Sequence, residues 1–226
     1  AQMPNAVQIV FFNSATDRYG GDINDVDDED NDGNTDEGGD VSAVGYRLVY
    51  RDPIANEDPD RDNHPVFALY RNLVDPMPVF EDLLAQKDLL TAYGDGSFPP
   101  DNEPDTSPVN FVVENIFGMT ITFVIEFEDP ADPTLVQTER VTIMPSGTGG
   151  TGSTQEFVVA GDGIEIGGGG GGNSALSSGR VVAVDLSITV LSDFGMQQAA
   201  NTTIGVEQII RDHGYHYTKS VMVPQP

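Results

Sequence analysis

The segment RVVAVDLSITVL, Arg180–Leu191, decides the fold that the sequence predicts. Apolar residues at the even positions from 182 to 190 alternate with smaller or polar ones such as Asp185 and Thr189. A period of two places successive side chains on opposite faces of a strand, so one face is apolar and the other is polar. We therefore expect a strand here, with Asp185 on the exposed face.

Similar short runs of apolar or alternating residues recur along the chain and predict further strands. They lie at 7–12, 42–51, 66–71, 111–117, 119–127, 135–144, 156–160, 163–166 and 215–223. The run at 7–12, VQIVFF, is apolar throughout and predicts a buried strand. Turn signals at 129–133 (DPADP) and at Gly161-Asp162 predict two antiparallel hairpins.

Helical spacing is confined to three short stretches. Apolar residues at Val79, Phe80, Leu83 and Leu84 predict a helix at 79–86. Ser192-Asp193 can cap a helix that runs to about Ala200, and 204–211 predicts another. We therefore expect an α+β, β-rich fold of mainly antiparallel sheets with two or three short helices, in one domain spanning residues 1–226.

Composition limits the classes of partner. The 226 residues include 37 Asp and Glu but 10 Lys and Arg, a formal net charge of −27. This charge argues against nucleic acid and anionic lipid, which need a positive surface, and fits saline or calcium-rich surroundings. The absence of cysteine excludes disulfides, thiolate zinc sites and a cysteine nucleophile. The sequence contains no run near the ~20 apolar residues of a membrane span and no signal peptide.

The acidic loop 20–41 suggests a cation site. Ten of the nineteen residues from 22 to 40 are Asp or Glu, and the sequence DEDNDG at 28–33 is typical of a calcium loop. Gly39 occupies the position where such loops carry a bidentate Glu, so a re-spaced loop is needed, and a solvated acidic loop is the alternative. The candidate Ca²⁺ ligands are Asp28, Asp30, Asp32, Asn34, Asp36, Glu37 and Asp40.

Other candidate chemistry is weaker. His213 and His216 are three apart, but 215–223 alternates like a strand, so a shared metal is disfavoured. The Gly-rich loops at 146–154 and 167–174 are expected to be hairpin loops, because a strand follows Gly167–Gly172 where a phosphate site needs a helix. No catalytic residue is predicted, although Glu114, Glu126 and Asp185 are the carboxylates nearest to strands. Three scarce basic residues are expected to pair with carboxylates across strands: Arg47, Arg71 and Arg180.

Five segments resemble one family in the same order: SAVGYRLVYRDP, FALYRNLVDP, NFVVENIFGMTITFVIEF, GRVVAVDLSITVLSDFGM and YHYTKSVMVPQP. The resemblance is to the prepilin-type proteins of Verru_Chthon cassettes and, more distantly, to the J-type minor pseudopilin of type II secretion. It covers roughly residues 42–224 and consists of strand patterns with a few polar markers.

The resemblance implies a pilin-like globular head and a structural, non-catalytic subunit of a type IV pilus-like or type II secretion-like filament. Its partners would be other pilin or pseudopilin subunits, and its location would be periplasmic or at the cell surface. Membrane contact would run only through an N-terminal pilin helix, which this chain lacks, as expected of a truncated head. The alternatives are a calcium-dependent cell-surface adhesin or carbohydrate-binding β-sandwich and, less favoured, a secreted hydrolase that uses carboxylates.

Overall fold

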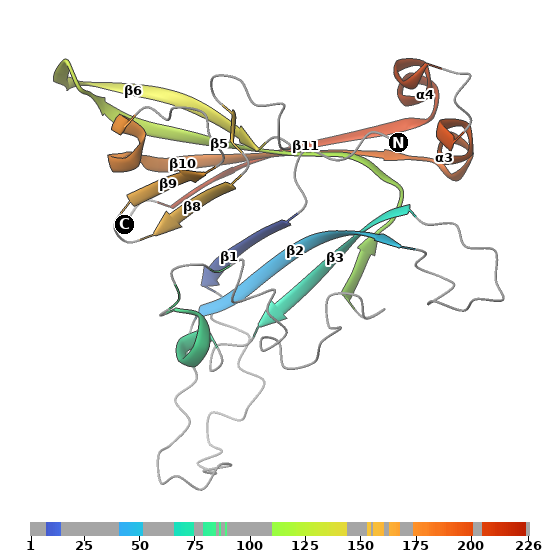
Figure 1. Ribbon diagram of the computed structural model, residues 1–226, viewed down its shortest axis with the longest axis horizontal. Coiled ribbons are helices and arrows are strands. Elements are labelled where there is room, and N and C mark those ends of the chain that lie inside the picture. Colours follow the sequence, from blue (N-terminus) through green and yellow to red (C-terminus); the bar gives the residue numbers. More distant parts are fainter. Residues whose placement is uncertain are drawn as a thin grey trace, which may run out of the picture. The chain divides into compact units, whose positions relative to one another are not determined.

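The computed structural model describes residues 8–14, 41–51, 66–74, 79–84, 86, 89, 110–143, 153–154, 156–160, 163–167, 174–200 and 205–224. The chain divides into two compact units, each built around one main sheet. Most of one unit is Val113–Pro226, and most of the other is Gln8–Leu48 with Leu69–Val112. Figure 1 labels most strands of both sheets, and each unit is described by itself below.

The first unit contains a five-stranded sheet of order β11-β10-β5-β6-β7. Its strands pair antiparallel, apart from the parallel contact between β6 and β7. Its strands are β5 Ile116–Asp129, β6 Asp132–Ile143, β7 Ser153–Thr154, β10 Arg180–Leu191 and β11 Gly214–Met222. The predicted strand at Arg180–Leu191 is confirmed with the same bounds, and the predicted antiparallel hairpin of β5 and β6 is confirmed as well.

The register of β5 against β10 explains the two faces of this sheet. Leu186 lies opposite Ile121, whereas Asp185 lies opposite Thr122. Directly opposed residues point to the same face, so one face collects aliphatic side chains and the other collects hydroxyls and charges. The alternation in Arg180–Leu191 therefore continues across the neighbouring strands.

A small hairpin covers part of the apolar face. Its strands, β8 Glu156–Ala160 and β9 Gly163–Gly167, pair antiparallel as predicted, and the 3-10 turn Ser174–Ser178 follows them. The ring of Phe157 stacks on that of Phe123 at 3.9 Å between centroids. The buried residues of this core come from the sheet, the hairpin and the turn: Ile125, Phe127, Val141, Ile164, Leu176 and Val181.

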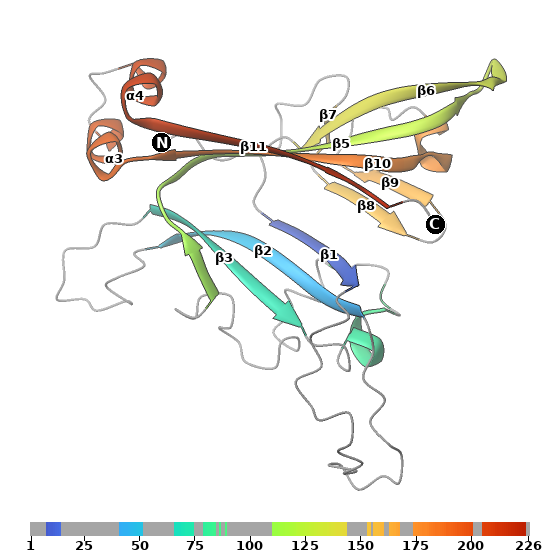
Figure 2. The same cartoon turned by 180° about the vertical axis from the view of Figure 1, so that it is seen from behind.

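Two short helices, α3 Asp193–Ala200 and α4 Val206–His213, connect β10 to β11. The Ser192 hydroxyl accepts a hydrogen bond from the Gly195 N–H at 3.2 Å, which confirms the predicted cap of the first helix. Both helices lie at the same end of β10 and β11, as Figure 2 shows from behind. There Leu191, Phe117 and Ile209 form a small buried cluster.

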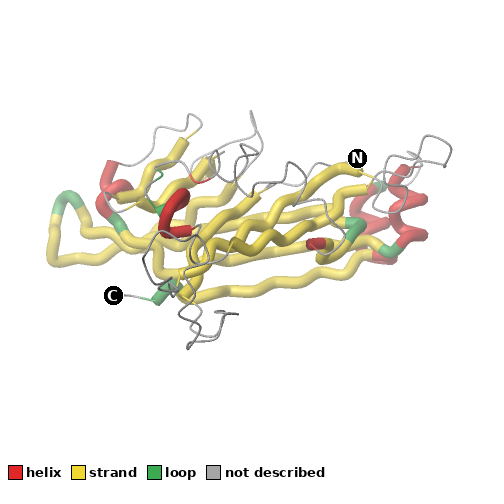
Figure 3. Tube along the Cα trace, turned by 90° about the horizontal axis from the view of Figure 1, so that it is seen from below, coloured by secondary structure: helices red, strands yellow, loops and turns green. Residues whose placement is uncertain are grey.

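The predicted α+β fold is wrong, because the described chain is mostly β with antiparallel sheets. Figure 3 shows strands dominating the trace, with helices as short pieces. Each of the two α-helices has eight residues, about two turns, and serves as a strand connection rather than as a layer on a sheet. The helix predicted at 79–86 is a π-helical turn, Val79–Leu83, closed by the Leu84 N–H on the Val79 carbonyl at 2.9 Å. The expected α+β class of the pilin-like head is therefore wrong, and the described chain is mostly β.

The second unit holds a four-stranded sheet of order β1-β2-β3-β4. These strands are β1 Gln8–Ser14, β2 Val41–Arg51, β3 Val66–Val74 and β4 Phe111–Val113. Ala43, Val74, Val79 and Leu83 form its buried core. The prediction that 7–12 is a buried strand is wrong in one respect: β1 is an edge strand, and Phe11 and Phe12 are 41% and 37% exposed.

The sequence also predicted strands at 111–117 and 119–127, but the break comes earlier. Asn115 adopts φ 61°, a left-handed conformation that Asn tolerates better than most residues, and it separates β4 from β5. Gly118, where the sequence placed the boundary, lies inside β5.

Parts of the predicted loops lie outside the described residues. Of the acidic loop 20–41, only Val41 is described, as the start of β2. The Gly-rich loops are described only where β7, β9 and the 3-10 turn adjoin them. In the part of the chain that the structure describes, no helix has the length and apolar character needed to cross a membrane.

Candidate protein-interaction surface

All seven predicted calcium ligands lie outside the described residues. They are Asp28, Asp30, Asp32, Asn34, Asp36, Glu37 and Asp40. The described residues contain no group of three or more His, Cys, Asp or Glu side chains that could hold a metal ion. The calcium loop therefore stays a prediction.

The polar face of the five-stranded sheet carries a small electrostatic network. Asp185 of β10 accepts a hydrogen bond from the Arg140 guanidinium of β6, two strands away. The Ser220 hydroxyl of β11, and then Arg140, hold the pKa of the Asp185 carboxyl below its usual value, because both hydrogen bonds favour the ionised form. This network joins three strands, and the sequence prediction missed both partners of Asp185.

A second ion pair involves Arg180, whose pairing across strands was predicted without its partner. The Arg180 Nη2 lies 2.9 Å from the Glu126 Oε2, on strands β10 and β5, which are neighbours. This confirms the expected cross-strand pairing for Arg180. Arg180 is exposed and Glu126 is half-buried at the surface, so the pair contributes little to stability.

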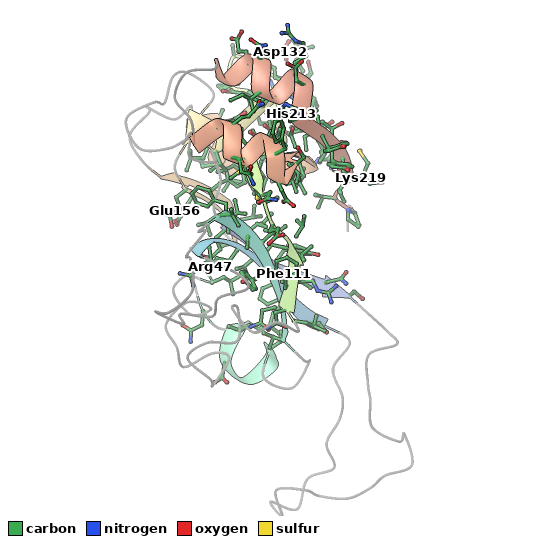
Figure 4. The ribbon with its side chains drawn as sticks, turned by 90° about the vertical axis from the view of Figure 1, so that its right-hand side faces the viewer. Arg47, Phe111, Asp132, Glu156, His213 and Lys219 are labelled. Atoms are coloured by element: carbon green, nitrogen blue, oxygen red, sulfur yellow. The ribbon has the colours of Figure 1, made fainter. Side chains whose placement is uncertain are left out.

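The predicted histidines belong to different elements. His213 ends α4, and its ring meets that of Phe194 edge-on at 5.2 Å between centroids. His216 lies on β11, where its ring nitrogens are within hydrogen-bond distance of the hydroxyls of Thr189 (3.0 Å) and Ser187 (3.3 Å). Figure 4 shows His213 at the helices, with Lys219 farther along β11. The two histidines thus have separate structural partners.

The outer edge of the sheet is β11, which is last in the strand order of the described residues. The Val223 N–H donates to the Val182 carbonyl, and the Ser192 N–H donates to the His213 carbonyl. Hydrogen-bonded pairs alternate along an antiparallel ladder, so the odd-numbered residues of β11 bond β10. The backbone groups of the even-numbered residues His216, Thr218, Ser220 and Met222 point away from β10. The N–H of Gly214, at the start of the strand, donates to the Ile210 carbonyl of α4.

Side chains along this edge are exposed on both faces of the strand. Tyr215 and Tyr217 are 60% and 61% exposed, and Val221 and Met222 are exposed as well. A long edge strand with exposed apolar side chains is a surface on which another strand can add. The sequence predicted the strand, but its edge position follows from the strand order and was not predicted.

The described surface is suited to binding a protein through backbone pairing. Several polar side chains of the five-stranded sheet lie in cross-strand hydrogen bonds, such as that between the Thr122 and Thr142 hydroxyls at 2.9 Å. Two of the three carboxylates singled out from the sequence, Glu126 and Asp185, are paired with arginines. Glu114 lies in the link between β4 and β5.

Comparison with known proteins finds no family model, no curated protein and no solved structure that matches this chain significantly.

Proposed function

We propose that the chain is a non-catalytic structural subunit of an exported filament of the type IV pilus or type II secretion kind. The observation that carries the proposal is the position of β11 at the edge of the described sheet, with its outward backbone groups and exposed tyrosines. Such an edge gives affinity through main-chain hydrogen bonds and selectivity through alternate side chains. Its partners are other subunits of the filament.

The resemblance to prepilin-type proteins supports the same proposal. Each of the five resembling segments contains a strand of the described sheets: β2, β3, β5, β10 and β11. The strong negative charge suits an exported protein in saline surroundings, where cations screen repulsion. A calcium ion held by the acidic loop would stabilise such a subunit in a calcium-rich medium.

The proposal is tested on cells that make the protein. An antibody raised against the 226-residue chain should label surface filaments in electron micrographs and detect the chain in sheared filament fractions. The gene should encode, before Ala1, a prepilin cleavage site followed by an apolar stretch of about 20 residues. Confinement of the chain to the cytosol, or an ordinary secretory signal in the gene, would refute the filament role. EDTA-sensitive glycan binding by the purified chain would favour the adhesin instead.

A further inference from the structure

The charge distribution makes β11 an edge that another acidic protein can approach, and unlike the acid-free edge strand β1 it carries a basic residue. Residues 214–226 contain no Asp or Glu, although the chain has 37 of them, and β11 carries Lys219 near its centre. The neighbouring Asp185 is paired with Arg140. A second copy of a chain with net charge −27 is repelled overall but meets no carboxylate on this strand.

We propose that β11 pairs antiparallel with β11 of a second copy of this chain, about a two-fold axis through Thr218. Antiparallel pairing about an axis perpendicular to the sheet keeps each face continuous across the junction. The outward backbone groups belong to even-numbered residues, so these must oppose one another. Centring the axis on Thr218 overlaps the strand Gly214–Met222 with its counterpart, with the backbone groups of His216, Thr218 and Ser220 at the centre of the pairing.

In this register the side chains of β11 complement themselves. Tyr217 lies opposite Lys219 of the second copy, an aromatic ring beside a cation. Tyr215 lies opposite Val221, and an aromatic residue beside a β-branched one is a favourable cross-strand pair. On the polar face, His216 lies opposite Ser220, and Thr218 lies opposite its own counterpart.

The neighbouring registers are worse. Centring the axis on Lys219 places two lysines directly opposite each other, which is destabilising. Centring it on Tyr217 shortens the paired segment and moves Met222 beyond the end of its partner strand. Lys219 and the length of the overlap thus select the register, while Tyr215, Tyr217 and Val221 supply the contact surface.

A single-cysteine scan tests the register, because the natural chain has no cysteine. The two-fold axis brings position 218 opposite itself, with Cα atoms about 5.5 Å apart, within disulfide range. Under mild oxidation Thr218→Cys should form a covalent dimer, whereas the matched variants His216→Cys and Ser220→Cys should not. Cross-linking strongest at another position, or none at position 218, would overturn the proposal.

A matched charge pair tests the contact by sedimentation equilibrium of the full chain. Tyr217→Glu places a carboxylate opposite Lys219 of the second copy, and Tyr217→Lys places a second ammonium there. The dimer Kd of the lysine variant should be about tenfold higher, since two symmetry-related pairs change sign. The overall charge of −27 predicts the opposite order, because the lysine variant is less acidic. Equal Kd values, the reverse order, a strictly monomeric wild-type chain or growth beyond a dimer would each refute this pairing.

The inference deepens the proposed function by naming the partner at β11, and the two can fail separately. If the purified chain is monomeric but antibodies still label surface filaments, only the β11 pairing is refuted. If the chain forms the predicted dimer but is confined to the cytosol, only the filament role is refuted.

Discussion

Replacing Asn115 tests whether one side chain holds the start of β5 to the helical connection. Asn115 is 8% exposed and adopts φ 61°. Its side-chain amide donates to the Asp193 carboxylate at 2.7 Å, and its main-chain carbonyl accepts from the Leu191 N–H at 3.0 Å. The side chain thus links residues 78 positions apart in the sequence, at the point where β10 gives way to α3.

The magnitude has two parts. A hydrogen bond to a charged group contributes about 1.5–3 kcal/mol, and the exposure of Asp193 reduces this to about 1–1.5 kcal/mol. A left-handed conformation costs an ordinary residue about 1 kcal/mol more than it costs Gly. Asn115→Gly should therefore lower the free energy of unfolding by about 1–1.5 kcal/mol, and Asn115→Ala by about 2–2.5 kcal/mol.

Urea unfolding followed by circular dichroism measures both variants, since the chain has no Trp for fluorescence. Combining Asn115→Gly with Asp193→Ala completes a double-mutant cycle, whose coupling free energy should be about 1 kcal/mol. The reasoning fails if the alanine and glycine variants are equally stable, because the left-handed backbone then costs nothing. A coupling free energy near zero would show that the hydrogen bond does not stabilise the fold.

Three further predictions concern metal, backbone and pH. Calcium at a hundredfold excess over its Kd should stabilise the natural chain by about 2.7 kcal/mol, and Asp30→Ala with Asp32→Ala should remove most of this rise in melting temperature. Gly163→Ala should lower the free energy of unfolding by more than about 2 kcal/mol, because φ is +131° and the added Cβ would lie 2.2 Å from a backbone oxygen. Asp185 has a lowered pKa, so its pairing stabilises the fold above the unfolded pKa of about 3.9 and is lost as pH falls through the folded value. The difference in melting temperature between the natural chain and Arg140→Gln should therefore narrow on acidification.

Each of these predictions has a control or a contrary outcome. An unchanged calcium response in the double aspartate variant would refute the assignment of the acidic loop. Gly118→Ala is the match for Gly163→Ala, because its added Cβ meets its nearest neighbour at an ordinary 3.8 Å and should cost little. A difference in melting temperature between the natural chain and Arg140→Gln that stays unchanged when the folded chain is acidified until its carboxyl groups are protonated would exclude Asp185 as its cause.

The sequence correctly predicted several elements that depend on local patterns. Alternation placed β10 at Arg180–Leu191, and turn residues placed the β5–β6 and β8–β9 hairpins. The α+β class was wrong because the two α-helices have only eight residues each and connect strands in a mostly β chain. The short helix predicted at 79–86 is a π-helical turn, since a short apolar spacing fits both. The break at Asn115 was missed, since nothing nearby in sequence marks its bond to Asp193.

The candidate surface was harder to predict, because it depends on which strand ends the sheet. The alternation in YHYTKSVMV predicts a strand whether the segment lies at the centre or at the edge of a sheet. Only the strand order of the described residues places β11 outermost. The same holds for Asp185, whose partners Arg140 and Ser220 come from strands far away in the sequence. Which strands pair depends on residues far apart in the sequence, and the alternation of side chains along one strand does not predict it.

The exposed edge of β11 and the charge of −27 have to be considered together. An edge strand with two exposed tyrosines would favour indiscriminate strand pairing in a weakly charged chain. Here electrostatic repulsion opposes every approach that brings acidic surfaces together, while the acid-free strand β11 leaves a route open. Lys219 then disfavours the register that opposes it to itself. Charge thus restricts where copies of the chain meet, and the backbone of β11 determines how they pair.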